Sequence, residues 1–484
     1  MSDEQALPPE LNIAPEDWRE MPASVQALVL SLHAQLVALT QEVAQLREQV
    51  KRNSRNSSQP PSSDPPDQKP PPSKAKPPKK RRKRGGQPGH KGHHRIVVPP
   101  EQVDRFEMCK PSHCHDCGHE LVGDDPDLYR YQTVEIPPPK ADVTEYQVHR
   151  LTCPDCGAQT RGSLPSEAAA SQFGVNVSTW IVLLMGVYRL SKRQVADLLA
   201  TTYGIHISPG SVVNLQKRAS EALAPIVDEA VEAVKTQPAR YIDDTGWQQR
   251  DIARKSYLWV VVTPLVTVFH IVASRAGQVA KDLLGEDSEG AAISDRASSF
   301  SWLKERVWQV CWAHLLRDFQ KILDRGGASF PVGETLRIQA EYLLMSWGRV
   351  RDGTLSHADF LTELPTIQDA VHQALVAGTQ CDHAKTAETC RRLLAVESAL
   401  WTFATHPEVE PTNNAAERAL RPAVIWRKTS YGTQSEAGSR FVERILTVVA
   451  SARQQDRNPF ELVLAALQAQ RLGTIPPSLL QPLS

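Results

Sequence analysis

The sequence predicts a multidomain protein in which helical and cysteine-rich segments precede an α/β domain. At 484 residues the chain exceeds what a single hydrophobic core supports. Apolar residues recur with helical spacing near the N-terminus and with strand spacing after Pro238, and two Cys-x-x-Cys pairs lie between. These changes predict six segments, with bounds 21–52, 53–100, 101–165, 166–235, 236–455 and 456–484.

The first segment, 21–52, has the spacing of a coiled coil. Its apolar residues recur in alternating steps of four and three, namely Val25, Val29, Leu32, Leu36, Leu39, Val43, Leu46 and Val50. The alternative is a single amphipathic helix that packs on a globular domain. Because no globular pattern adjoins the segment, self-association of the chain is favoured.

The second segment, 53–100, is a basic, Pro-rich arm predicted to be disordered, since it has too few apolar residues to form a core. The whole chain has 55 Lys plus Arg and 55 Asp plus Glu, yet Lys69 to Arg95 contains eleven cations and no acid. Such a run is usually only solvated, but its place between two predicted binding modules favours contact with DNA phosphates. The candidates are Lys79, Lys80, Arg81, Arg82, Lys83 and Arg84.

The third segment, 101–165, is predicted to be a zinc ribbon that binds DNA. Cys114, Cys117, Cys153 and Cys156 form two Cys-x-x-Cys-Gly units, whose four thiolates suit tetrahedral Zn²⁺ in a structural role. The glycine after each pair permits a tight turn that aims backbone amides at sulfur. Residues 131–136 and 143–148 alternate like strands and predict a hairpin between the pairs. Substitute ligands remain open: Cys109, His113, His115 and His119.

The sequence favours a cytoplasmic protein without a membrane partner. Trp180 to Leu190 is too short to span a bilayer, and Tyr257 to Ala273 is interrupted by Pro264. The acidic first twenty residues do not resemble a signal peptide. In that compartment the eight cysteines favour metal ligands or buried thiols over disulfides.

The fourth segment, 166–235, is predicted to be helical. Ser208 as N-cap and Pro209 at the first helical position mark a helix start after the break at Gly204. Two helices across such a turn resemble a helix-turn-helix motif, although simple antiparallel packing gives the same pattern.

Segment 236–455 has the element order of a ribonuclease-H-like α/β domain, namely three strands followed by strand-helix alternation. The predicted strands are 240–242, 256–263, 266–274, 291–294 and 307–311. Asp243 follows the first strand and Asp295 the fourth, which are neighbours in that architecture. Residues 314–405 are predicted to form a large helical insertion, with Trp347 and Trp401 in its core rather than stacked on a base. A C-terminal helical tail, 456–484, follows.

Glu417 is the candidate for a third acid, on a late helix. Its spacing from Asn414 also fits a capping box, so a role at the helix end remains the alternative. Three carboxylates could hold Mg²⁺ or Mn²⁺, and a pair of such ions roughly 3.5–4 Å apart activates the nucleophile and stabilises the leaving oxygen in phosphodiester chemistry. Asp243 and Asp244 compete for one place, because successive strand residues face opposite sides.

The sequence resembles the large transposase of the insertion-sequence-sixty-six family. The resemblance rests on the heptads, Asn53 to Asp64, Gly85 to His90, the cysteine pairs, Cys311 to Arg317 and Asn413 to Arg418. It implies an Asp-Asp-Glu enzyme with Asp243, Asp295 and Glu417 as catalytic and magnesium-binding residues, which acts on element ends and target DNA with accessory proteins of the same element. Asp244 replaces the glutamate that follows the family's first aspartate. DNA contacts are expected from His314, Arg317, Arg427 and Lys428, which could instead serve packing or lie at the surface.

Two other functions remain compatible with these patterns. A catalytically inactive zinc-containing DNA-binding regulator derived from a transposase would keep every binding feature. A repair or junction nuclease of the same fold would cut DNA without joining it.

Overall fold

The computed structural model describes residues 11, 13–50, 56, 97–165, 168, 171–305 and 307–480, with the side chains of 41, 44–50, 304 and 305 left aside. The chain divides into two compact units. Unit 1 comprises Met1–Pro65, Val148–Val195 and Ser208–Ser484, and unit 2 comprises Pro66–Gln147 and Ala196–Ile207. The basic run 79–84 falls outside the described residues.

The N-terminal heptad segment forms one long helix, α2 (Ala23–Val50), after the short α1 (Pro15–Glu20). The helix is as predicted, and its apolar side chains at 32, 36 and 39 are more than half exposed. Residues Ala23–Thr40 are also long and apolar enough to cross a membrane by length and composition, a window that the sequence analysis did not single out. One such helix is weak support for a span, and the heptad spacing accounts for the same residues.

Unit 2 contains the first cysteine pair, the 3-10 turn η2 (Pro100–Gln102) and most of helix α5 (Lys192–Tyr203). The hairpin predicted from 131–136 and 143–148 is wrong, since neither segment is a strand. Pro137, Pro138 and Pro139 separate the segments and supply no backbone donors. Ile136 and Val143 are 79% and 90% exposed, so no buried face fixes a register.

A short hairpin forms instead around the second cysteine pair, in unit 1. It pairs β1 (Arg150–Thr152) with β2 (Gln159–Arg161), antiparallel. Its residues are exposed on both faces. The local turn between the cysteines, rather than a hydrophobic face, therefore holds these strands together.

The helical region contains α4 (Val175–Gly186), α5 (Lys192–Tyr203) and α6 (Pro209–Val234). Ser208 is the N-cap of α6 as predicted, and its side chain accepts a hydrogen bond from Ser211 N at 3.0 Å. Gly204 ends the preceding helix with φ +66°, a left-handed conformation that suits glycine. Within unit 1, α6 packs against α4 and two C-terminal helices, which buries ten of its side chains.

The centre of unit 1 is a five-stranded mixed sheet in the order β5-β4-β3-β6-β7. All five predicted strands form: β3 (Ala239–Trp247), β4 (Ser256–Val262), β5 (Thr267–Val272), β6 (Ala291–Ser294) and β7 (Trp308–Val310). The first three are antiparallel, and β3, β6 and β7 are parallel. Between β5 and β7 lie α7 (Gly277–Leu284) and the 3-10 segment η3 (Ser298–Glu305).

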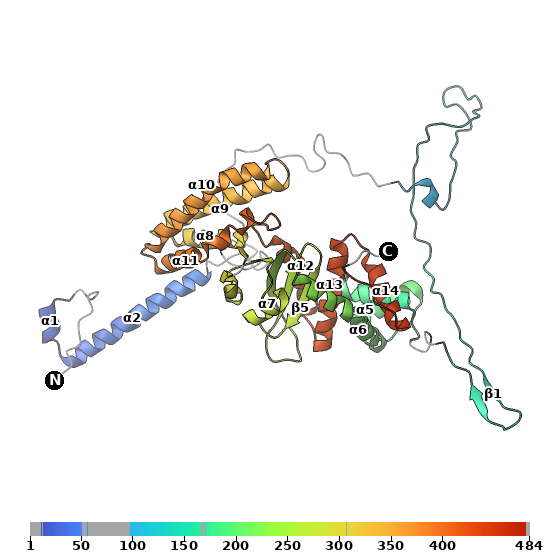
Figure 1. Ribbon diagram of the computed structural model, residues 1–484, viewed down its shortest axis with the longest axis horizontal. Coiled ribbons are helices and arrows are strands. Elements are labelled where there is room, and N and C mark those ends of the chain that lie inside the picture. The colour runs from blue at the N-terminus through green and yellow to red at the C-terminus, as the bar shows by residue number, and fades with distance from the viewer. Residues whose placement is uncertain are drawn as a thin grey trace. The chain divides into compact units, whose positions relative to one another are not determined.

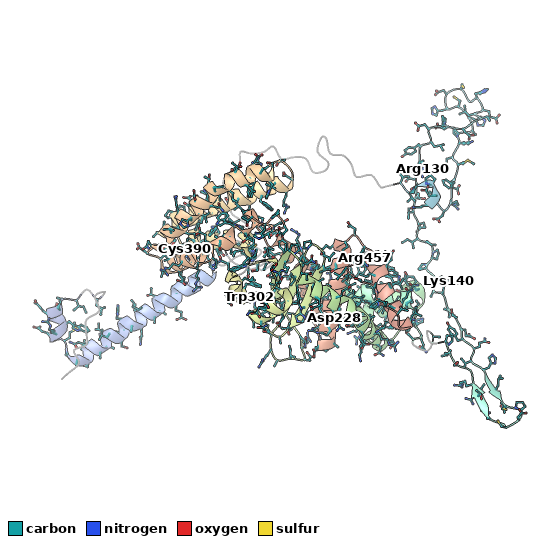
Figure 2. The ribbon with its side chains drawn as sticks, viewed as in Figure 1. Arg130, Lys140, Asp228, Trp302, Cys390 and Arg457 are labelled. Carbon is teal, nitrogen blue, oxygen red and sulfur yellow. The ribbon has the colours of Figure 1, made fainter. Side chains whose placement is uncertain are left out.

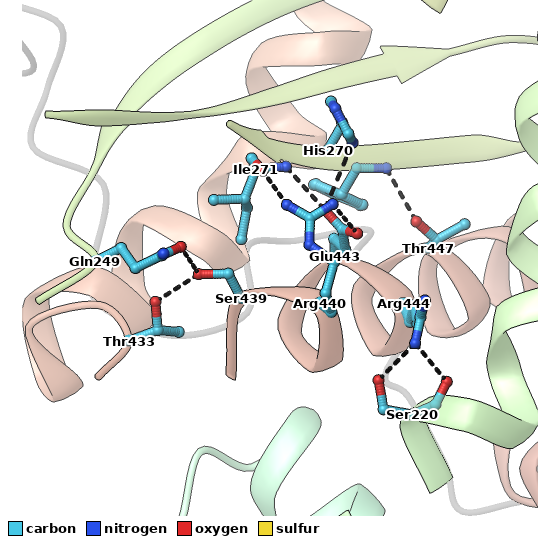
Figure 3. A network of polar contacts seen from close by, with 11 residues as sticks. Ser220, Gln249, His270, Ile271, Thr433, Ser439, Arg440, Glu443, Arg444 and Thr447 are labelled. Atoms are coloured by element: carbon cyan, nitrogen blue, oxygen red, sulfur yellow. Dashed lines mark hydrogen bonds and ion pairs between the residues drawn. The ribbon is translucent and has the colours of Figure 1, made fainter. Parts of the chain in front are cut away.

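Helix α13 (Glu436–Gln454) closes the β5 edge of this sheet through side chains (Figure 3). Glu443, Thr447 and Ser451, spaced four residues apart, accept hydrogen bonds from the amides of Ile271, Phe269 and Thr267 at 2.9–3.0 Å. Four helical residues rise about 6 Å and two strand residues about 6.8 Å, so the two repeats match. The helix thus accepts the hydrogen bonds of the β5 edge amides, which would otherwise be unpaired and available to another strand.

The insertion is helical as predicted and follows β7. It comprises α8 (Trp312–Arg325), α9 (Ser329–Arg351), α10 (His357–Thr379) and α11 (Ala384–Leu394), with 3-10 turns η4 (Glu397–Leu400) and η5 (Thr402–Ala404). Figure 1 shows α9 and α10 side by side, and α8 packs on α9. Trp401 packs 4.8 Å from Trp312, and Trp347 packs against Phe360 and Phe403, so both tryptophans lie in its aromatic core.

The buried thiols of this region are structural. Cys390, labelled in Figure 2, is buried in α11, and burial raises its pKa to about 11.

The chain then returns to the sheet through α12 (Asn414–Ser430), which packs on β3 and β4, and ends in α13 and α14 (Pro459–Leu472).

Candidate functional site

The sheet places Asp243 and Asp295 beside each other. Strands β3 and β6 are parallel, with Tyr241 opposite Ile293. Two residues further along each strand are Asp243 on β3 and Asp295, the first residue after β6. Because parallel strands keep their register, these two carboxylates meet at the carboxyl end of the sheet, as the sequence predicted.

Asp243 lies in an acidic, poorly solvated environment. Burial raises the pKa of its carboxyl well above the ordinary value, and the charges of Asp295, Asp244 and Glu417 raise it further. An amide hydrogen bond from Asp244 N to Asp243 Oδ1, at 2.8 Å, opposes this effect. The cluster therefore lacks enough positive charge to balance its carboxylates.

Asp244 forms an ion pair with Arg275. Its carboxylate accepts two hydrogen bonds from Arg275 Nε, at 3.0 and 2.8 Å, and is 3% exposed. Burial raises the pKa of Asp244, whereas the Arg275 guanidinium lowers it. The charge of Glu417 is among the causes that raise the pKa of Asp243, so Asp243 is electrostatically coupled to the third acid.

Glu417 reaches the site from the first turn of α12, and it does not close a capping box. The N-cap of α12 is Asn413 rather than Asn414, and it makes no side-chain cap bond. The Asn413 side chain instead donates from Nδ2 to the carbonyl of Ile242 at 2.8 Å, while its backbone amide donates to Cys311 Sγ at 3.1 Å. The start of α12 is thereby fastened to β3 next to Asp243.

Helix α8 supplies the partners of Glu417. Arg317 Nη2 donates to Glu417 Oε1 at 3.2 Å, and His314 Nδ1 lies 3.7 Å from the same oxygen. Burial and the Arg317 charge lower the pKa of His314, so the imidazole is neutral at neutral pH. His314 and Arg317 therefore lie beside Glu417, and the DNA contacts expected of them from the motif Cys311 to Arg317 stay a prediction.

The donor set suits a hard divalent cation, but the side chains are not yet gathered around one. Asp243, whose pKa is raised by burial and by the charges of neighbouring carboxylates, is the kind of group whose charged form Mg²⁺ stabilises. Within the described ranges, no group of three or more His, Cys, Asp or Glu side chains has the spacing to hold a metal ion.

The two cations predicted after the third acid lie on the last turn of α12. Arg427 Nη1 donates to Thr245 Oγ1 at 3.1 Å and also to the carbonyl of Gly246. The guanidinium therefore forms hydrogen bonds with the last part of β3 in this structure. Lys428 is the next residue on the same turn.

The two cysteine pairs belong to different units, and each folds into the same kind of turn. Gly118 and Gly157 both adopt φ +72°, as predicted, and each donates to the carbonyl of the pair's first cysteine at 3.0 Å. Backbone amides of the turns lower the pKa of the thiols of Cys114 and Cys153. Each turn thus favours the thiolate form that zinc needs.

Two site residues escaped the sequence analysis. Arg275, which neutralises Asp244, follows β5 in a stretch that carries no motif. Asn413 belonged to the quoted Asn413 to Arg418 pattern, in which the sequence suggested its neighbour Asn414, as one of two alternatives, for a cap. The signal in the sequence was the asparagine that precedes the helix. When such a side chain is buried, it has to form hydrogen bonds with groups of the protein.

Comparison with known proteins decides the family. A model of the transposase IS66 family matches residues 170–440, more than half of the chain. The chain belongs to the transposase IS66 family. This match contains all three acids, and residues 6–96 match a separate family of unknown function (DUF6444).

Curated relatives of this transposase-family chain come from Sinorhizobium fredii (strain NBRC 101917 / NGR234). Uncharacterized protein y4qI is 28% identical over 156 residues, 31% of this chain and 28% of the relative. Uncharacterized protein y4hP is 24% identical over 403 residues, 74% of this chain and 71% of the relative. The chain thus aligns with about a quarter of the first relative and about seven tenths of the second.

Proposed function

We propose that this member of the transposase IS66 family is a DNA transposase that binds the terminal inverted repeats of its element and catalyses metal-dependent cleavage and strand transfer. The supporting observation is the pairing of Asp243 with Asp295 on adjacent parallel strands, with Glu417 electrostatically coupled to Asp243. The strand order β5-β4-β3-β6-β7 supports our assignment of a ribonuclease-H-like domain. Phosphodiester transfer on DNA is the chemistry that such an acidic centre performs.

Each residue has a defined task in this proposal. Asp243, Asp295 and Glu417 would hold Mg²⁺ or Mn²⁺, which when bound stabilises charge on the attacking and leaving oxygens. Asn413 positions the helix that carries Glu417. Arg317 neutralises Glu417 before metal and DNA arrive, and then becomes available to a phosphate.

The remaining modules are proposed to recognise DNA and assemble the complex. Cys114, Cys117, Cys153 and Cys156 would share one structural Zn²⁺, and the arm at 79–84 would contact phosphates. The exposed heptad face of α2 would pair with a second copy of the chain, which sedimentation of the full chain would detect. We place the protein in the cytoplasm, with accessory proteins of its element as further partners.

Single amide substitutions test the enzymatic proposal. Asp243→Asn, Asp295→Asn and Glu417→Gln should each lower the rate of DNA cutting by at least about 100-fold, since even partners outside the metal's own ligands are worth about 10–100-fold. The substrate is labelled duplex DNA that carries the ends of the chain's own element, with Mg²⁺. Binding, measured by gel shift, should be retained.

Asp244→Asn is the matched control, because its carboxylate is paired with Arg275. It should cut far better than Asp243→Asn. A wild-type chain that shifts the DNA without nicking it would identify an inactive regulator, and cutting without joining would identify a nuclease. Cleavage retained by any triad variant would remove that residue from the catalytic set.

A further inference from the structure

A small cavity of 190 Å³ lies beside the acidic centre and is lined mainly by cations. Arg296, which directly follows Asp295, contributes to one wall. Helices α8 and α11 provide the others. The complete lining is Arg296, Asp318, Lys321, Arg325, Thr389 and Arg392.

The charge of the cavity favours an anion. Four of its six lining residues are cationic and one is acidic. Asp318 already pairs with Arg296, and Glu388 pairs with Arg392 from outside the lining. Lys321 belongs to neither of these pairs and adds a further positive charge to the lining. By contrast, the larger cavity of 420 Å³ at the other end of β6 is lined by one lysine, two glutamates, His406 and uncharged residues.

The size and donor types suit a phosphate group. A volume of 190 Å³ corresponds to about six water molecules at about 30 Å³ each, which accommodates a phosphate with part of its hydration shell. Guanidinium groups bind phosphate oxygens in a bidentate manner, and Lys321 adds a point charge. Thr389 supplies a hydroxyl donor on the α11 side.

Helix α8 connects this cavity to the acids. His314, Arg317, Lys321 and Arg325 follow one another in steps of three, four and four residues, so they share one face of the helix. Arg317 contacts Glu417 near one end of the face, and Lys321 and Arg325 line the cavity at the other. The face is about 16 Å long, which is comparable to about five nucleotides of a strand that rises about 3.4 Å for each.

We propose that this cavity holds a backbone phosphate of the DNA strand that enters or leaves the acidic centre, with Arg296, Lys321, Arg325 and Arg392 as its ligands. The proposal rests on the proposed function and adds a binding site to it. The helical insertion then acts as part of the substrate track, because α8 and α11 both belong to it. Sequence-independent phosphate contact positions a strand without selecting its bases.

The salt dependence of DNA binding tests the site. The full chain is titrated with a fluorescent duplex of mixed sequence at several NaCl concentrations, as wild type and as the Lys321→Gln/Arg392→Gln variant. We expect the slope of log K against log salt to become shallower by about 1, the change for one lost phosphate contact. DNA cutting should also slow, while inorganic phosphate should compete for binding only weakly.

Arg391→Gln is the matched control. Arg391 neighbours Arg392 and pairs with the same Glu388, at 2.8 Å, but does not line the cavity. It removes one positive charge, where the double variant removes two, and should leave the slope unchanged. Equal slopes for all three proteins would overturn the site while leaving DNA cutting, and hence the proposed function, intact. Failure of the wild-type chain to cut DNA would instead count against the function.

A second measurement needs no variant. Acylation of lysines in the wild-type chain, quantified by mass spectrometry, should fall several-fold at Lys321 when the duplex is added. Lys281 on α7, which pairs with Glu286, should react equally with and without DNA. Unchanged reactivity of Lys321, or its protection by inorganic phosphate but not by DNA, would refute the assignment of a strand phosphate.

Discussion

The cysteine turns and the acidic centre are assembled in opposite ways. Each cysteine pair is completed within six residues, by a positive-φ glycine and backbone amides that point at sulfur. The acidic centre draws on β3, the end of β6 and the first turn of α12, elements that the whole sheet must first bring together. A local site can thus form before the fold is complete, whereas the acidic centre depends on the fold.

The largest expected effect is on zinc. Replacing Cys114 and Cys153 together by serine should abolish zinc binding, because apparent binding free energies of structural zinc are about 10–16 kcal/mol and depend on thiolates. Metal content measured by mass spectrometry of the purified chain should fall from one zinc per chain to none. The acidic centre, being separately assembled, should keep its magnesium response.

Cys109→Ser is the control for that experiment, since Cys109 lies outside both turns. It should retain zinc. Zinc retained by the double variant would show that the pairs do not act as ligands. If Cys109→Ser loses zinc, Cys109 belongs to the ligand set in place of one turn cysteine.

A second prediction concerns the electrostatic cost of the acidic centre. The pKa of Asp243 is raised above its ordinary value of 3.8 in the folded chain, so the folded state keeps a proton that the unfolded state has released. Stability without divalent cations should therefore decrease as pH rises from about 4 through the raised pKa. Asp243→Asn should remove that decrease and be more stable than wild type at pH 7 in EDTA.

The stabilisation of the folded chain by Mg²⁺ should also differ between wild type and Asp243→Asn. A cation that binds only the folded state at 100 times its Kd adds about 2.7 kcal/mol. Thermal melting should show this gain for wild type and much less for Asp243→Asn. A wild-type chain whose melting temperature ignores both Mg²⁺ and pH between 4 and 7 would mean that the carboxylates do not share a cation.

The contrast between the two sites also explains what the sequence could predict. The turns were predictable with their glycine conformations, because every determinant lies within a few residues. The strands and the Asp243–Asp295 pair were predictable because the strands are periodic and parallel neighbours align their carboxyl ends. The hairpin at 131–148 failed because alternation alone does not supply a packed face.

The contacts of the third acid could not be predicted from the sequence, for a different reason. Glu417 was predicted to be the third acid, and local spacing equally suggested a capping box with Asn414. Only tertiary contacts separate these alternatives, since the Asn413 bond to Ile242 and the Arg317 bond to Glu417 join residues far apart in the chain. The Arg275 partner of Asp244 is unpredictable for the same reason.

The smallest predicted effect tests whether one long-range hydrogen bond positions the third acid. Asn413→Ala removes the donor to the buried Ile242 carbonyl, which should cost about 1–3 kcal/mol of unfolding free energy. Because the first turn of α12 would then be held less firmly, the rate constant for DNA cutting should fall while duplex affinity stays the same. Asn414→Ala, one residue further and only partly buried, is the matched control and should preserve both. If Asn413→Ala loses stability but cuts at the wild-type rate, the bond stabilises the fold without positioning Glu417, and the acidic centre is less dependent on α12 than its geometry indicates.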